Sequence, residues 1–105
     1  MRKIKSTEKE TQKACIDYLT KRQIFFWRQN SGGFKTEKGH FYSMGIKGAP
    51  DIFAVIKGIL YAFEIKDIKG KQNENQIEFE KNLKKAGGKY FVIRDIDELI
   101  VLLAT

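Results

Sequence analysis

The chain has 105 residues, of which 42% are hydrophobic, and a formal net charge of +7. This length suits one domain over residues 1–105, and the apolar fraction excludes a disordered chain. The single cysteine excludes an intrachain disulfide, and no apolar run approaches the ~20 residues of a membrane span, so we expect a cytoplasmic protein without a membrane partner. The basic balance favours a polyanionic partner such as nucleic acid, although excess lysine can also serve solubility alone.

The first predicted element is an amphipathic helix over residues 7–22. Ser6 or Thr7 can cap its N-terminus, because their hydroxyl oxygens accept hydrogen bonds from the first-turn N–H groups. Cys15 and Leu19 mark its apolar stripe, so we expect both in the core.

A strand is predicted over residues 24–28, which are mainly β-branched and aromatic. Its Trp27 is expected in the core rather than as a platform on which a base stacks. Residues 29–49 then predict a long loop, and loops of this length within a compact domain are usually functional or mobile.

A β-hairpin is predicted next, because residues 51–56 and 59–66 have strand character and flank Lys57-Gly58. This dipeptide suits a two-residue hairpin turn, which pairs residue 56 with residue 59. The register of both strands follows from that first pair.

Continued to the open end of the hairpin, this register places Asp51 directly opposite Glu64. Side chains alternate along a strand, so Lys66 projects from the same face as Glu64. Opposed Cβ atoms lie about 4.5–5.5 Å apart, where two like charges destabilise a hairpin unless a cation lies between them. A divalent metal ion meets that need, whereas the alternative is a solvated cross-strand pair of acids beside a lysine.

The rest of the chain predicts a helix over residues 74–86, a strand over residues 89–93 and a last helix. Asn73 caps the first of these helices, Gly87 ends it, and Asp95 caps the second. The apolar positions expected to face the core are Phe79, Leu83 and Ala86 in the first helix, and Ile96, Leu99, Ile100 and Leu103 in the second. The predicted order is therefore helix, three strands, helix, strand, helix.

A series of short motifs accompanies the paired carboxylates. In chain order they are Trp27-Arg28-Gln29-Asn30-Ser31-Gly32-Gly33, Lys47-Gly48-Ala49-Pro50-Asp51, Glu64-Ile65-Lys66, Gln76, Ala86-Gly87-Gly88 and Val92-Ile93-Arg94. Over about residues 7–94 this series resembles the stand-alone VRR-NUC family of the PD-(D/E)XK nuclease superfamily. The resemblance implies an α/β fold with a restriction-endonuclease-like αβββαβ core, to which the last helix is an addition.

The same resemblance implies a magnesium-dependent DNA endonuclease, an enzyme in which manganese can replace magnesium. Asp51 and Glu64 would then hold the metal, with the Ile65 carbonyl as a third ligand. Lys66 would orient the attacking water or stabilise its developing charge. The alternative is a non-catalytic nucleic-acid binding module on the same fold.

The stand-alone members that the chain resembles are mainly phage or bacterial proteins. They imply branched DNA, such as a four-way (Holliday) junction, as the substrate, and a bacterial or phage-infected host cell as the location. One such domain carries a single site, so symmetric cutting of two strands requires a homodimer.

Two further polar residues occupy apolar helix faces. At about 100° per residue, Glu8 falls on the apolar stripe of its helix and Glu10 falls on the opposite face. We therefore predict that Glu8 points toward the paired carboxylates, although an acid in the first turn can also stay solvated. Gln76 either supports the catalytic site, as the resemblance implies, or bonds its own first turn.

Candidate DNA-binding residues surround the glycine-rich loop, where the backbone can approach phosphates closely. They are Arg28, Gln29, Asn30, Ser31, His40 and Lys47. His40 is the only histidine, and with one cysteine in the chain a zinc site is disfavoured.

Overall fold

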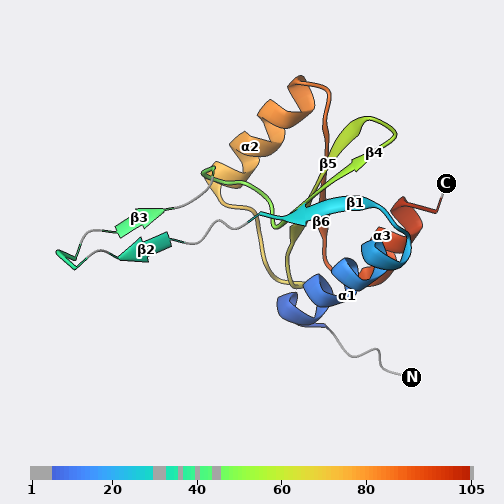
Figure 1. The fold of residues 1–105 in the computed structure, drawn as a ribbon, viewed down its shortest axis with the longest axis horizontal. Coiled ribbons are helices and arrows are strands. Elements are labelled where there is room, and N and C mark those ends of the chain that lie inside the picture. Colours follow the sequence, from blue (N-terminus) through green and yellow to red (C-terminus); the bar gives the residue numbers. More distant parts are fainter. Residues whose placement is uncertain (1–5, 30–32, 36, 40, 44–45, 105) are drawn as a thin grey trace.

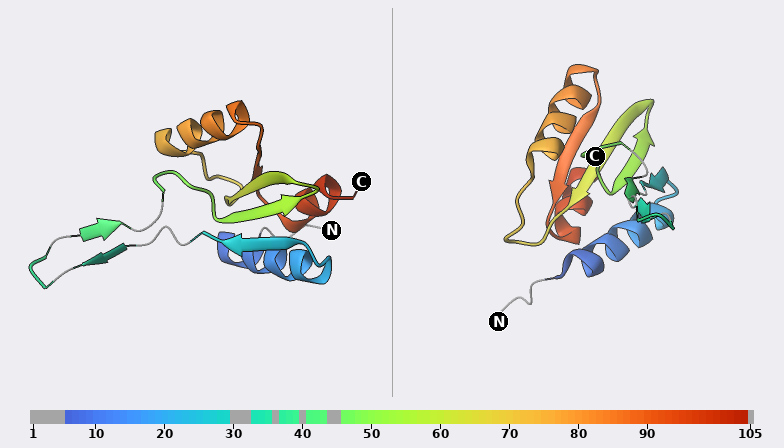
Figure 2. Two further views of the ribbon diagram at one scale, coloured as in Figure 1. Left: turned by 45° about the horizontal axis from the view of Figure 1, so that its top comes forward. Right: turned by 90° about the vertical axis from the view of Figure 1, so that its left-hand side faces the viewer.

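A four-stranded sheet lies between α2 on one face and α1 and α3 on the other (Figures 1 and 2). The computed structural model describes residues 6–29, 33–35, 37–39, 41–43 and 46–104. The helices are α1 (Glu8–Lys21), α2 (Glu74–Lys85) and α3 (Ile96–Leu102). The strands of this sheet are β1 (Phe25–Arg28), β4 (Ile52–Ile56), β5 (Ile59–Ile65) and β6 (Lys89–Ile93).

The sheet has the strand order β1-β4-β5-β6, so β1 and β6 form its edges. The pairs β1–β4 and β4–β5 are antiparallel, whereas β5 and β6 are parallel and are connected through α2. A parallel pair needs such a crossover because its two strands begin at the same edge of the sheet. This arrangement confirms the predicted αβββαβ core with an additional C-terminal helix.

Each face of the sheet packs against its own helices. The larger cluster joins the face toward α1 and α3, and its buried members are Cys15, Leu19, Ile52, Ala54, Phe63, Ile65, Ile93, Leu99 and Leu103. The smaller cluster joins the face toward α2 through Phe53, Ala62 and Tyr90, with Phe79 and Leu83 packed against them. Cys15 is fully buried, as predicted, and burial raises the pKa of its thiol to about 12.

All three helices begin with a capping box, in which the N-cap side chain and the third helical residue bond each other's backbone N–H groups. The N-caps are Thr7, one of the two residues predicted for the first helix, and Asn73 and Asp95, as predicted. None of the helices in the described ranges is long and apolar enough to cross a membrane.

The loop predicted over residues 29–49 is wrong in part, because it contains a second, two-stranded sheet. Strands β2 (Gly33–Lys35) and β3 (Phe41–Ser43) pair antiparallel and extend away from the body of the protein (Figures 1 and 2). Phe34, Phe41 and Tyr42 supply the aromatic content that favours strands. The strand propensity of these residues outweighs the loop propensity of the nearby glycines, on which the loop prediction rested.

Three residues predicted to be buried are exposed. Trp27 is 39% exposed, although its ring stacks on Phe53 with centroids 5.3 Å apart. Its side chain lies on the α2 face of the sheet, where α2 packs toward β6 at the far edge and leaves the edge strand β1 open. Ala86 follows the last turn of α2 and is exposed, and Ile100 is 38% exposed on α3. Residues in edge strands and at helix ends have fewer packing neighbours than the apolar pattern of the sequence implies.

Gly48 brings the segment before β4 against the first turn of α2. Its φ is +78°, and a Cβ there would overlap the Asn75 carbonyl. Gly58 has a similar φ of +80° but nothing within 4 Å of such a Cβ. Substitutions at the two glycines can therefore be compared to separate the free-energy cost of a positive φ from the cost of a steric overlap with α2.

We expect Gly48→Ala to destabilise the fold by roughly 1–3 kcal/mol more than Gly58→Ala, because only the first also overpacks against backbone. Urea unfolding of the two variants measures this difference. Equal losses of stability would show that the segment can move away from α2 at no cost.

Candidate active site

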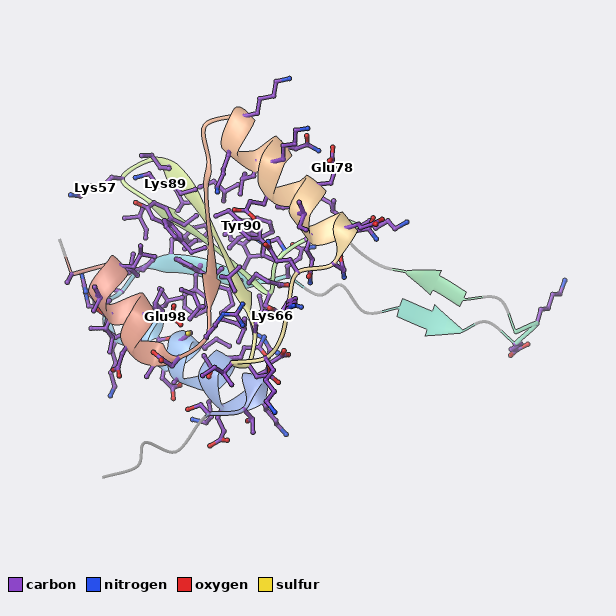
Figure 3. All side chains as sticks on the ribbon, turned by 180° about the vertical axis from the view of Figure 1, so that it is seen from behind. Lys57, Lys66, Glu78, Lys89, Tyr90 and Glu98 are labelled. Carbon is purple, nitrogen blue, oxygen red and sulfur yellow. The ribbon has the colours of Figure 1, made fainter. Side chains whose placement is uncertain are left out.

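A tight turn sets the register that brings Asp51 opposite Glu64. Lys57 and Gly58 have φ angles of +52° and +80°, as a type I′ hairpin turn requires. Ile56 pairs with Ile59, and the ladder continues to the pair Ile52–Phe63, which confirms the predicted register. Figure 3 shows Lys57 at the tip of this hairpin and Lys66 at its opposite end.

Asp51 is anchored by the strand that carries Glu64. The Ile65 N–H donates a hydrogen bond of 2.8 Å to Asp51 Oδ2, across the pair that the register predicts. The Gln29 N–H donates to the Asp51 carbonyl at 2.9 Å, so the end of β1 also joins this corner of the sheet. Asp51 is thus held from both neighbouring strands, although it lies just before β4.

Glu64 is a buried acid whose carboxyl group is only half satisfied. Glu64 is 3% exposed, and its Oε1 accepts a hydrogen bond of 2.8 Å from Gln76 Nε2. Its Oε2 is buried and accepts no hydrogen bond from the described residues. A buried carboxylate oxygen without a partner is costly, so this atom needs a proton or a cation.

The electrostatics of the site favour the protonated acid when no cation is present. The pKa of Glu64 rises from 4.5 to about 8, and burial is the largest cause. Repulsion from Asp51, and the hydrogen bond that a protonated Glu64 shares with Asp51, raise the pKa further. The Lys66 ammonium lowers it, and the Glu8 carboxylate raises it.

Gln76 bonds both its own first turn and the buried Glu64, so the two contacts that the sequence posed as alternatives occur together. Its Oε1 accepts the Asn73 N–H at 2.9 Å in the capping box of α2, while its Nε2 donates to Glu64. Only one orientation of the amide satisfies both bonds, because the oxygen must face the N–H and the nitrogen must face the carboxylate. The first turn of α2 therefore fixes the orientation of Glu64.

The segment after β5 is held in place by Arg94, whose role the sequence did not reveal. Arg94 lies just beyond β6 and donates to the Asp67 carbonyl at 2.6 Å and to the Gly70 carbonyl at 2.7 Å. Asp67 Oδ1 accepts the N–H groups of Lys69 and Gly70 at 2.9 and 2.6 Å. A Cβ on Gly70 would lie 3.2 Å from Lys66 Cδ, so this turn packs on the stem of the lysine.

Glu8 lies nearer the candidate site than Glu10, but both residues are exposed, so the prediction that Glu8 points into the domain is met only in part. The Asp67 N–H donates to Glu8 Oε1 at 3.4 Å, and Glu8 is close enough to raise the pKa of Glu64. Glu10 accepts hydrogen bonds from the N–H and hydroxyl of Thr7 in the capping box, and is exposed. The first carboxylate therefore turns toward the candidate site, while the second closes the helix end.

The residues present suit a hard divalent cation. Asp51 and Glu64 supply oxygen ligands, and the unpartnered Oε2 of Glu64 is the atom that a cation would satisfy. Within the described ranges, no group of three or more His, Cys, Asp or Glu side chains converges on one point. Magnesium commonly uses one or two carboxylates and keeps several waters, so two acids and a backbone carbonyl such as that of Ile65 are sufficient.

The predicted DNA-binding residues are only partly placed. Arg28 is exposed at the end of β1, Gln29 joins the Asp51 corner through its backbone, and Lys47 is exposed just before Gly48. The remaining candidates, Asn30, Ser31 and His40, lie outside the described residues. The end of β1 and the segment before β4 therefore bring the placed candidates to the same end of the sheet as the carboxylates.

Comparison with known proteins identifies the fold. No protein-family model and no curated protein matches the chain. A solved structure described as a VRR_NUC domain matches it with a TM-score of 0.69, over 94% of this chain and 97% of that chain. The chain has the fold of a VRR_NUC domain. The sequence identity is 20%, so the match establishes the fold.

The raised pKa of Glu64 predicts how the stability of the metal-free protein depends on pH. Between pH 4.5 and about 8 the native state keeps a proton that the unfolded chain releases, so stability falls as the pH rises. Glu64→Gln should remove this loss and exceed the wild type above pH 8 by on the order of a few kcal/mol.

Urea unfolding at several pH values in EDTA tests this expectation. Glu78→Gln makes the same chemical change on the exposed surface of α2 and is the matched control. A Glu64→Gln profile that runs parallel to the wild type from pH 5 to 9 would contradict the proposed environment of Glu64.

Proposed function

We propose that this protein is a magnesium-dependent DNA endonuclease, in which manganese can replace magnesium. The observation that carries the proposal is the buried, half-satisfied Glu64 opposite Asp51 at one end of a VRR_NUC fold. Burial of Glu64 beside Asp51 is costly when both acids are ionised, so a purely structural role leaves the pair unexplained. The net charge of +7 suits a DNA partner.

In the proposed reaction each residue of the site has a separate task. Asp51, Glu64 and the Ile65 carbonyl would hold the metal, which supplies Lewis acidity and charge neutralisation at the scissile phosphate. The Ile65 N–H and Gln76 orient the two carboxylates by occupying one oxygen of each. Lys66 would orient the attacking water and stabilise the negative charge that develops on it.

The substrate class, assembly and location follow from the family that the motifs resemble. We propose branched DNA, such as a four-way junction, as the substrate, and a homodimer as the assembly that cuts two strands symmetrically. We place the activity in the cytoplasm of a bacterial or phage-infected cell. A nicking assay on four-way, flap and linear DNA, with and without magnesium, tests activity and substrate together.

The first prediction concerns metal binding. Magnesium should raise the melting temperature of the wild type, because a ligand that binds only the native state stabilises it by about 1.4 kcal/mol at ten times its Kd. Asp51→Asn should lose most of this shift, while above pH 8, where both acids are ionised, its metal-free form is at least as stable because a like-charge pair is relieved. An identical melting temperature across a millimolar titration of the wild type would contradict the metal site.

The second prediction concerns cleavage. Lys66→Ala should slow cutting by about 10²–10³-fold and retain DNA binding, because one preorganised charge is lost. Glu8→Gln should also impair cutting, whereas Glu10→Gln keeps the capping box and should change stability by less than about 0.5 kcal/mol.

Single-turnover cleavage of the best substrate in the nicking panel measures both effects. Full activity of Lys66→Ala would refute its role, and impairment by Glu10→Gln alone would refute that of Glu8. DNA binding without cutting by the wild type at any magnesium or manganese concentration would favour the non-catalytic alternative.

A further inference from the structure

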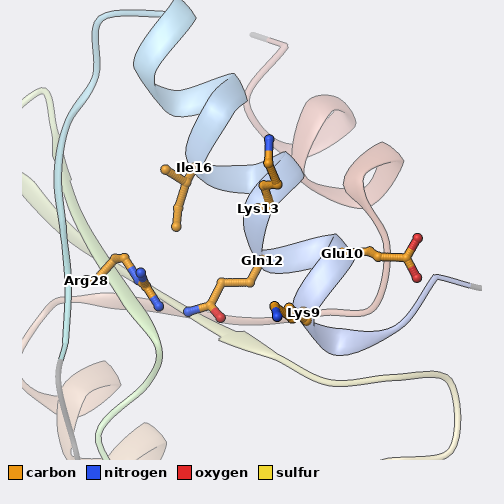
Figure 4. Close-up of a pocket in the computed structure, with 6 residues that line it drawn as sticks. All are labelled: Lys9, Glu10, Gln12, Lys13, Ile16 and Arg28. Carbon is orange, nitrogen blue, oxygen red and sulfur yellow. The ribbon is translucent and has the colours of Figure 1, made fainter.

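A second candidate site lies beside the proposed active site, on the other side of the sheet. A pocket of about 400 Å³ separates the N-terminal half of α1 from the end of β1. Its lining residues are Lys9, Glu10, Gln12, Lys13, Ile16 and Arg28 (Figure 4). Three of these six side chains are cationic, so the pocket suits an anion.

Three donors of this pocket are available to a ligand. Among the described residues, no hydrogen bond or ion pair engages the side chains of Lys9, Gln12 or Arg28. Figure 4 shows Gln12 and Arg28 pointing toward each other. The other charged lining residues are engaged elsewhere. Lys13 pairs with Asp17 at 2.9 Å, and Glu10 is held by Thr7 and points away from the pocket (Figure 4).

The position of the pocket relates it to the paired carboxylates. Arg28 pairs with Ile52, the residue after Asp51, so both sites lie at the same end of the sheet. Gln12 lies one helical turn after Glu8, and residues four apart are neighbours on a helix surface. Arg28 projects to the α1 face because Ile52, its partner in the ladder, packs in the core on that face. A ligand that crosses this end of the sheet therefore passes both sites.

We infer that the pocket formed by Lys9, Gln12 and Arg28 binds a phosphate of the DNA backbone outside the phosphodiester that is cut. The guanidinium group matches two phosphate oxygens, the lysine adds a point charge, and the glutamine amide adds a neutral donor. Such contacts position a duplex without reading its sequence. The inference rests on the proposed function, and it extends the substrate path from the carboxylates around the edge of the sheet to α1.

Salt-dependent DNA binding without divalent metal tests this inference. For the double variant Lys9→Gln/Arg28→Gln we expect Kd to rise roughly tenfold at fixed salt, to the same extent for unrelated DNA sequences. The slope of log Kd against log salt concentration should fall by about one, the value for one phosphate contact. Gln12→Ala should weaken binding without changing the slope, because it removes a donor but no charge.

The matched control is Lys21→Gln/Lys85→Gln, which removes the same two charges from the last turns of α1 and α2. Lys21 lies about 18 Å along the helix from Lys9 at 1.5 Å per residue, and neither control lysine lines the pocket. Melting temperatures of all variants show whether each is folded. If the double variant does not fold, the expected effect of Gln12→Ala still decides the question.

Three results would overturn the inference. They are a salt slope of the double variant equal to that of the control, wild-type affinity in Gln12→Ala, or tight AMP binding that the double variant loses, which would assign the pocket to a free nucleotide. Failure of the proposed function is distinct from all three. Wild-type protein that binds DNA with the expected slope but never cuts it would defeat the nuclease and leave the pocket in place.

Discussion

A carboxylate buried inside a protein must be protonated, hydrogen-bonded or paired with a cation, and this constraint on Glu64 organises one end of the molecule. The hairpin turn brings the Asp51 carboxylate against it, which raises the pKa of Glu64 further in a site already removed from water. Gln76 and the Ile65 N–H satisfy one oxygen of each acid. The remaining buried oxygen is the feature that a purely structural site would not keep, because it destabilises the fold unless something binds there.

Elements from across the chain converge to hold this unfavourable arrangement. The capping box of α2 orients Gln76, and Gly48 allows the segment before Asp51 to pass against the same helix turn. On the other side, Arg94 fixes the turn that follows Lys66, and that turn carries the N–H that binds Glu8. The larger apolar cluster lies on the face of the sheet that packs against α1 and α3. Rigid elements on both sides can therefore hold the two acids close together even when both are ionised.

Local patterns in the sequence predicted most of this end of the molecule, because its geometry depends on short-range rules. A two-residue turn fixes a register, and helix phase separates Glu8 from Glu10. Predictions that depended on distant neighbours were less successful. Trp27 is a large aromatic residue of the kind expected in a core, yet the helix that would cover it packs over other strands. The role of Arg94 depends on the parallel pairing of β6 with β5, which brings the ends of the two strands together. No local sequence pattern predicts that pairing.

The central claim is that a divalent cation completes the pair Asp51–Glu64. Diffraction from crystals grown with manganese tests it most directly, because the anomalous signal locates the ion without reference to activity. We expect one strong peak in direct contact with the Glu64 oxygen that has no protein partner and with the Asp51 carboxyl group, and its loss in Asp51→Asn. Manganese bound only elsewhere, with the two acids sharing a proton in saturating metal, would contradict the account.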